Sequence, residues 1–139
     1  MKNRGTRTVG RPVPHLSALK HCTGEAEYVD DMPRQHNELF GAPVMSKMAH
    51  AEIISVDWTA ALEMPGVVGY LDKNSLSSDQ NTWGPVVRDE ELFADGKVHF
   101  YGQIIGLVYA ESALQARAAA DRVQVTYNAL PSIVTIDDA

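Results

Sequence analysis

The stretch from 97 to 128 constrains the fold most, because three elements can be read from it in succession. Residues 98–109 are rich in β-branched and aromatic side chains, and a Gly-Gln dipeptide interrupts them, which predicts two strand segments around a bend. Ser112 is a favourable N-cap, and residues 114–122 are rich in alanine and contain no glycine or proline, which predicts a helix. Residues 123–128 alternate between apolar and polar side chains, as a half-buried strand does.

A strand, a helix and a strand in this order indicate a helix packed on one face of a sheet. We expect Leu114, Ala118 and Ala119 of the helix to be buried against Val123 and Val125 of the strand that follows. The fold class predicted from these elements is α+β.

Further strands are predicted at 39–48, 51–56 and 67–71, and a helix of one or two turns at 60–64. Asp57 or Thr59 can cap that helix, and a Pro-Gly dipeptide ends it. Because Pro43 has no N–H to donate, the first of these strands is expected at an edge or a bulge.

Several polar residues invite a functional interpretation, and each has a simpler one. His15, His21 and Cys22 lie close together, but a third ligand at helical or turn spacing is absent, which favours a structural or surface role over a metal site. The adjacent acids at 30–31 are expected to cap a turn rather than to bind calcium. His50 is expected to be hydrogen-bonded to backbone rather than catalytic.

Residues 72–96 are polar and have no clear periodicity. A segment of this length and composition is either a functional loop or a tolerated surface insertion, and composition alone favours the insertion slightly. Val86 and Val87 directly follow a Gly-Pro turn and precede four charged residues. If the loop contacts anything, these two valines are its contact tip.

Composition narrows the class of protein. The 139 residues suffice for one domain or for a piece of a larger protein, and 45% hydrophobic with 22% charged residues is globular. A net charge of −6 argues against nucleic acid as a partner, and Cys22 as the single cysteine excludes an internal disulfide and favours a reducing compartment. We expect a soluble chain with no membrane segment, with an extended lead-in at 1–14 and one domain at 15–139.

No catalytic motif stands out in the chain. Its glycine-containing run at 102–106 lacks the spacing of a dinucleotide fingerprint, and no Ser-His-Asp, Cys-His or His-x-x-Glu arrangement has usable spacing. We therefore predict no catalytic, cofactor-binding or metal-binding residues in this domain, and expect the isolated domain to be inactive. A last apolar run at 133–136, read as a terminal strand, runs almost directly into the end of the sequence, which indicates a fragment of a longer chain.

The run VGRPVPHLSALKHCTGEAEYVDDMP at 9–33 resembles the start of the molybdenum-binding half of the xanthine dehydrogenase and aldehyde oxidase family. Further matches follow in order along nearly the whole chain: ELF at 38–40, AHA at 49–51, MPGV at 64–67, KV at 97–98, YGQIIG at 101–106, AA at 118–119, VTY at 125–127 and LPSIVTIDDA at 130–139.

The resemblance implies an α/β-hammerhead domain, with about two helices against a mixed, bent β-sheet. It implies a position between the FAD domain and the main molybdopterin-binding region of a much longer homodimeric cytoplasmic enzyme, with the peroxisome as the alternative location. Such enzymes oxidise hypoxanthine to xanthine and xanthine to urate in purine catabolism. They use molybdenum in molybdopterin, two [2Fe-2S] clusters and FAD, and pass electrons to NAD or oxygen.

The family also places one hammerhead loop at the mouth of the substrate channel, with an apolar pair ahead of an Asn/His-Asp-Glu run. The corresponding run here is Arg88-Asp89-Glu90, so the resemblance assigns the channel-lining pair to Val86 and Val87. Many family members have a larger or aromatic residue there, and valines cannot stack on a purine.

Three functional hypotheses follow. The first is a domain of a xanthine dehydrogenase or oxidase, which the Gly84-Pro85-Val86 loop and the ending at 130–133 favour. The second is a domain of an aldehyde oxidase, which residues 15–21 and 64–68 favour. The third is a free-standing interaction module without chemistry. The sequence leaves open the electron acceptor and the oligomeric state.

Overall fold

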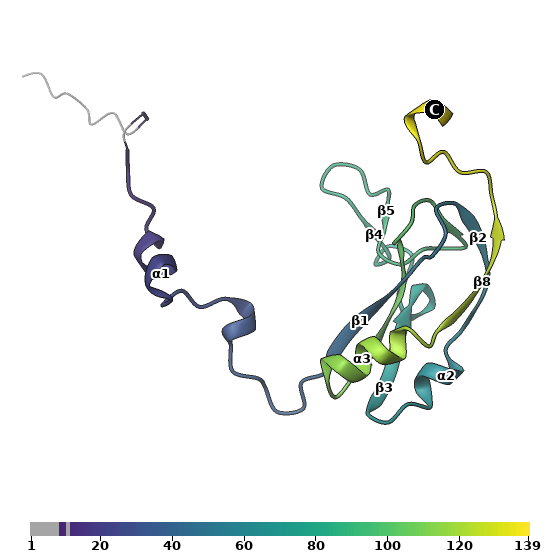
Figure 1. The fold of residues 1–139 in the computed structure, drawn as a ribbon, viewed down its shortest axis with the longest axis horizontal. Helices are drawn as coiled ribbons and strands as arrows, with labels where there is room; N and C mark the ends of the chain where they lie inside the picture. The colour runs from purple at the N-terminus through teal and green to yellow at the C-terminus, as the bar shows by residue number, and fades with distance from the viewer. Residues whose placement is uncertain (1–8, 11) are drawn as a thin grey trace, which may run out of the picture. The chain divides into compact units, whose positions relative to one another are not determined.

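The computed structural model describes residues 9–10 and 12–139 (Figure 1). The described residues fall into two units, one that ends at Gln35 and one that runs from His36 to Ala139. Most of the predicted lead-in at 1–14 lies outside the described residues.

The first unit contains two short helical segments, α1 (Ala18–Thr23) and the 3-10 turn η1 (Val29–Asp31). The backbone N–H of Tyr28 donates to Oδ2 of Asp31 over 3.0 Å, so the acidic pair caps a turn, as predicted. Among the described residues of this unit, none is buried. The segment therefore has local structure but no hydrophobic core of its own.

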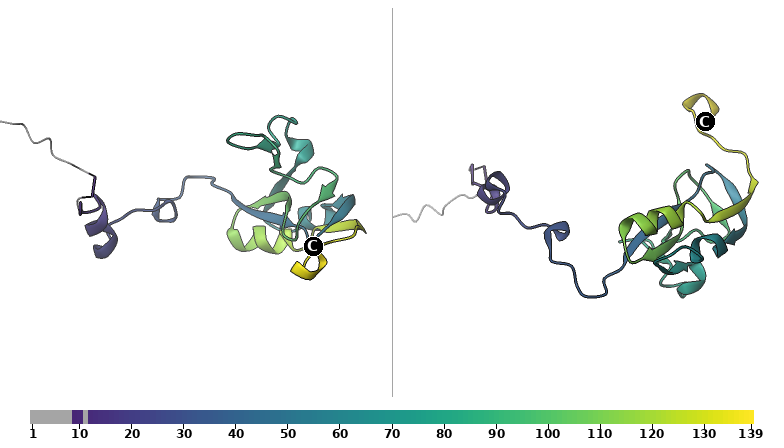
Figure 2. Two further views of the ribbon diagram at one scale, coloured as in Figure 1. Left: turned by 90° about the horizontal axis from the view of Figure 1, so that it is seen from above. Right: turned by 60° about the horizontal axis from the view of Figure 1, so that its bottom comes forward.

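The second unit is built from three small antiparallel sheets (Figures 1 and 2). In the first, the central strand β7 (Ile104–Ala110) lies between β1 (Phe40–Met45) and β3 (Val67–Asp72). In the second, β2 (Ala51–Asp57) lies between β6 (Lys97–Val98) and β8 (Gln124–Ala129). The third is the pair β4 (Thr82–Trp83) and β5 (Glu90–Glu91).

Helical segments connect some of these strands: α2 (Thr59–Leu62), η2 (Lys73–Ser75) and α3 (Ala113–Ala120). A further 3-10 turn, η3 (Ile136–Asp138), follows the last strand. The strand, helix and strand predicted at 98–128 are confirmed as β6 and β7, α3 and β8, with the bend at Gly102, whose φ is +88°. Ser112 caps α3 by accepting from the backbone N–H of Gln115. The strands flanking the helix, however, belong to different sheets.

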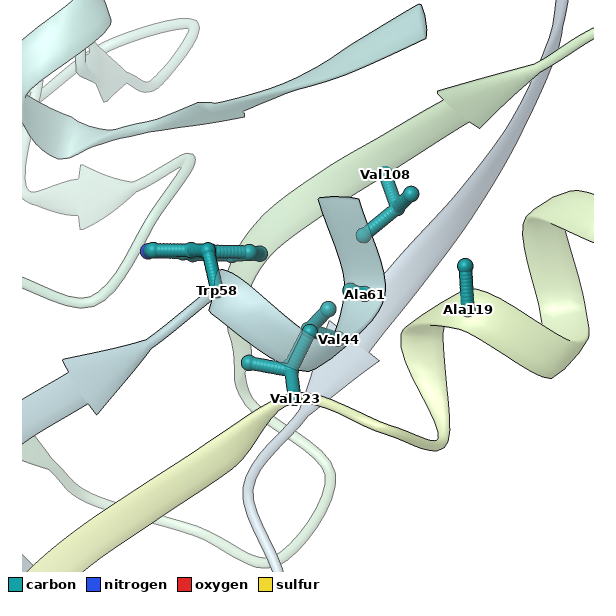
Figure 3. Packing of buried hydrophobic residues seen from close by; sticks show 6 residues of the cluster. All are labelled: Val44, Trp58, Ala61, Val108, Ala119 and Val123. Carbon is teal, nitrogen blue, oxygen red and sulfur yellow. The ribbon is translucent and has the colours of Figure 1, made fainter. Parts of the chain in front are cut away.

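The main core lies between α3, α2 and the first sheet (Figure 3). Its buried residues are Val44, Trp58, Ala61, Val108, Ala119 and Val123. The indole of Trp58 stacks on the ring of Tyr70, with centroids 4.4 Å apart and planes 10° apart. Trp58 directly follows β2 and precedes α2, and Tyr70 lies in β3, so this stacking packs the start of α2 against β3.

The predicted buried face of α3 is partly wrong. Ala116 and Ala119 are the buried residues of the helix, whereas Leu114 and Ala118 are exposed. The reason is helical spacing: 116 and 119 are three residues apart and lie on one face of α3, while 114 and 118 project from another side. Leu114 was predicted to be buried because its side chain is large and apolar, but α3 packs closely against β1 and β7 through alanines.

Pro43 lies in β1, an edge strand of its sheet, as predicted. The terminal apolar run at 133–136 is not a strand, and its apolar side chains are exposed. The pairing of β8 explains this difference: Ala129 already pairs with Ala51, the first residue of β2, so the chain beyond Pro131 has no further partner in that strand.

Candidate functional site

The segment 72–96, which has no periodicity in the sequence, contains a small hairpin. Thr82 pairs with Glu91 and Trp83 with Glu90, so residues 84–89 form the tip. Val86 and Val87, the predicted contact residues, lie in this tip and are 93% and 63% exposed. The structure therefore presents both valines to solvent at the tip of the hairpin.

Gly84 is required where the chain enters the tip. Its φ is +157°, and a Cβ atom at this position would lie 1.6 Å from the carbonyl oxygen of Val87. The clash is with backbone, which cannot move aside without opening the tip. The backbone of Val87 can therefore occupy its position only because residue 84 has no side chain.

The base of the hairpin is held by Asn81, which is 6% exposed. Its Oδ1 accepts from the backbone N–H of Phe93 over 2.9 Å, and its Nδ2 donates to the carbonyl oxygen of Phe93 over 2.9 Å. Its own carbonyl accepts from the N–H of Leu92 over 2.8 Å. One side chain therefore satisfies both backbone groups of a neighbouring residue, as a strand partner would. Sequence reasoning missed this residue, because an asparagine in a polar loop carries no distinguishing signal.

The hairpin is also joined to the second core cluster. After β5 the chain continues into Ala94, which is 2% exposed and donates its N–H to the carbonyl of Ile104 over 2.8 Å. Lys73 forms an ion pair with Asp95, which links the two ends of the segment. The tip is in this way carried on a base fixed to β7 rather than on a free loop.

Charge around the hairpin is mainly acidic. The side chain of Ser77 forms a hydrogen bond that holds the pKa of Asp79 below its ordinary value of 3.8, so Asp79 is ionised at neutral pH. Arg88 in the tip contributes a smaller electrostatic effect in the same direction.

The other candidate residues have structural surroundings. Nδ1 of His50 lies 2.6 Å from the carbonyl oxygen of Pro131, which confirms the predicted backbone hydrogen bond. Nδ1 of His21 lies 2.5 Å from the hydroxyl of Tyr28, and Cys22 is exposed.

Throughout 9–10 and 12–139, no group of three or more His, Cys, Asp or Glu side chains is placed to hold a metal ion. In the same described part of the chain, no helix is long and apolar enough to cross a bilayer.

The family described as "Aldehyde oxidase and xanthine dehydrogenase, a/b hammerhead domain" matches residues 23–131. The chain belongs to this α/β-hammerhead family, and the predicted family and fold are confirmed.

Known enzymes also match this sequence along nearly its whole length. The sequence is 62% identical over 133 residues to a nicotinate hydroxylase of Emericella nidulans and 50% identical over 135 residues to a xanthine dehydrogenase of Blastobotrys adeninivorans, each match covering 96% of this chain. It is 42% identical over 140 residues to aldehyde oxidase 1 of Bos taurus. In all three cases the chain spans only 10% of the relative's length.

Solved structures show the same fold. An aldehyde oxidoreductase from Desulfovibrio gigas superposes with a TM-score of 0.80 at 32% identity, covering 91% of this chain and 15% of that one. The CO dehydrogenase of Oligotropha carboxidovorans superposes with a TM-score of 0.79 at 31% identity, covering 91% of this chain and 16% of that one. In both, the matched domain is a small part of a larger chain.

Proposed function

We propose that this chain is the hammerhead domain of a larger molybdenum hydroxylase that oxidises an electron-poor nitrogen heterocycle. The observation that carries the proposal is the identity over 96% of the chain to two enzymes named for such substrates, 62% to a nicotinate hydroxylase and 50% to a xanthine dehydrogenase. Xanthine is the substrate favoured by the sequence analysis, and nicotinate is the second candidate because of the higher identity. The aldehyde alternative has the lower identity of 42%.

In this proposal the redox chemistry belongs to the rest of the polypeptide. The resemblance implies molybdopterin, two [2Fe-2S] clusters and FAD in the full-length protein, with NAD as acceptor, in a cytoplasmic homodimer. The FAD domain and the molybdopterin-binding domain would be the neighbours of the present chain. The domain itself would contribute scaffold and one wall of the substrate channel.

The hairpin tip at 84–89 is the channel wall that we propose. Two properties of the hairpin support this role: its base is fixed by Asn81 and by the Lys73–Asp95 ion pair, and its tip exposes two adjacent small apolar side chains. A fixed apolar wall can exclude water and limit the size of the ring that enters. Valines at both positions would leave a wider opening than the larger residues of many family members.

Turnover of nicotinate, xanthine and an aromatic aldehyde by the full-length protein tests the reaction class. We expect a hydroxylated pyridine carboxylate from nicotinate or urate from xanthine. Oxidation of the aldehyde alone would move the protein to the aldehyde branch and contradict the heterocycle proposal. Absence of turnover of all three by protein loaded with its cofactors would contradict it as well.

Replacing Val86 or Val87 with phenylalanine in the full-length protein tests the channel role. We expect a changed kcat/KM for the heterocycle, because a larger side chain narrows the entrance. Val68→Phe is the matched control, since Val68 is also an exposed valine but lies in β3 outside the tip. Equal effects at the tip and at the control position would refute a channel role.

A further inference from the structure

One end of the second sheet carries an exposed apolar surface that no part of the proposed channel uses. Three segments meet there: the turn before β2, the chain after β6 and the chain after β8. They meet because β2 is antiparallel to both neighbours, so its start lies beside the ends of β6 and β8. We define the sheet-end surface as His50, His99, Phe100, Tyr101, Ile133 and Val134, which border a cavity of about 560 Å³.

Four large apolar side chains of this surface are open to solvent. Phe100 and Tyr101 are 59% and 71% exposed, and Ile133 and Val134 are 69% and 68% exposed. Single exposed apolar residues are common on protein surfaces, but a contiguous group around a concavity is typical of an interaction site. Aromatic side chains are also enriched at such sites.

The surface is held in shape by hydrogen bonds. Nδ1 of His50 lies 2.6 Å from the carbonyl oxygen of Pro131, and the N–H of Leu130 donates to the carbonyl of His50 over 3.0 Å. These bonds tie the chain after β8 to the start of β2. The imidazole of His99 stacks on that of His50, with centroids 6.1 Å apart and planes 25° apart.

The hydrogen bond between His50 and Pro131 determines which nitrogen of His50 is an acceptor at the centre of the surface. A carbonyl oxygen can only accept, so Nδ1 of His50 carries the hydrogen. In the neutral ring, Nε2 is then an acceptor on the opposite side of the imidazole. A partner that matches this surface would present apolar side chains around one hydrogen-bond donor.

The surface also continues beyond the cavity. Tyr101 borders a second cavity of about 610 Å³, which is lined by the edge strands β1 and β8. The two concavities share this tyrosine and together extend from the sheet end along β8. A surface of this extent suits a folded domain better than a small ligand.

We propose that the sheet-end surface is the place where another domain of the same polypeptide docks. The inference rests on the proposed function, since it requires the longer protein. The relatives indicate what would occupy the sheet-end surface. The matched region is 10% of their length, so about nine tenths of each of these polypeptides lies outside it. A domain joined by the chain has a high effective concentration at this surface, which a free partner would lack.

Hydroxyl-radical footprinting of the native full-length protein tests the proposal, with the same protein unfolded in urea as the reference. From their exposure in this domain alone, Phe100 and Tyr101 would be protected less than about twofold. Docking predicts protection of roughly tenfold or more, as for side chains in the core of an interface. Protection below about twofold at both residues would overturn the proposal.

A pair of substitutions gives an independent test. Tyr101→Glu should lower the Tm of the full-length protein, because a carboxylate would be buried in the interface. Leu114→Glu is the matched control, since Leu114 is 80% exposed on α3, outside the surface. Equal Tm values for the two variants would contradict docking. Footprinting does not depend on turnover, so protection without turnover would refute only the proposed function, and turnover without protection only the docking.

Discussion

Replacing Asn81 with leucine should destabilise the domain far more than its place in a polar loop suggests. The substitution conserves most of the volume but removes both hydrogen bonds to Phe93, each 2.9 Å long. A hydrogen bond contributes about 1 kcal/mol, and a buried group left without a partner costs about 1–3 kcal/mol. Because Phe93 is half-buried and loses partners for both its N–H and its C=O, we expect a loss of about 2–4 kcal/mol in the free energy of unfolding.

Urea denaturation of the 139-residue chain, followed by tryptophan fluorescence, measures this loss. Asn128→Leu is the matched control: Nδ2 of Asn128 donates to Oε2 of Glu52 over 2.9 Å, but both side chains are exposed, so we expect a loss below about 1 kcal/mol. A loss below about 0.5 kcal/mol for Asn81→Leu would show that the hairpin base does not depend on the Asn81 side chain.

Three further predictions concern the core, a helix cap and pH. Gly106→Ala should lower the free energy of unfolding by about 1–3 kcal/mol in urea denaturation, because its Cβ would lie 2.6 Å from the indole of Trp58; an unchanged value would contradict this packing. Ser112→Ala removes the N-cap of α3 and should cost about 1 kcal/mol, with Ser112→Asp as a variant that restores it. Hydrogen bonds from Thr59, mainly from its side chain and also from its backbone, hold the pKa of Asp57 below 3.8. The stability that these bonds contribute to the folded state is therefore present above the unfolded-state pKa of Asp57, and is lost as pH falls through the lower folded-state pKa. Urea midpoints at pH 7 and at pH 3 should therefore differ less for Asp57→Asn than for the wild type, and equal differences would contradict the assignment.

Local signals in the sequence predicted the elements well. The alternation at 123–128, the alanine-rich run after Ser112 and the proline in β1 correspond to β8, α3 and an edge strand. The hydrogen bond of His50 to backbone was also predictable, because a single histidine at a strand junction has few other uses. These features depend on a few neighbouring residues, so they are the same however the elements pack together.

Features set by distant pairing could not be predicted. Nothing in residues 104–129 indicates that β7 and β8 enter different sheets, because that choice depends on β1, β2 and β3. The apolar run at 133–136 resembles a strand locally, but β2 has no residue left to pair with it, because Ala129 already pairs with the first residue of β2. The role of Asn81 depends on backbone groups twelve residues away. For Val86 and Val87, the family resemblance supplied the position, and their role as a channel wall stays a prediction.

A comparison of substrates with two ring sizes tests directly whether the hairpin tip lines the substrate channel. The measurement is kcat/KM of the full-length protein for nicotinate, a single ring, and for xanthine, a fused double ring, in the wild type, Val87→Phe and the control Val68→Phe. If the tip lines the channel, Val87→Phe should lower the xanthine-to-nicotinate ratio of kcat/KM by roughly tenfold, since steric exclusion in an apolar pocket has about this size. A ratio equal in all three proteins would contradict the assignment and leave the hairpin outside the substrate path.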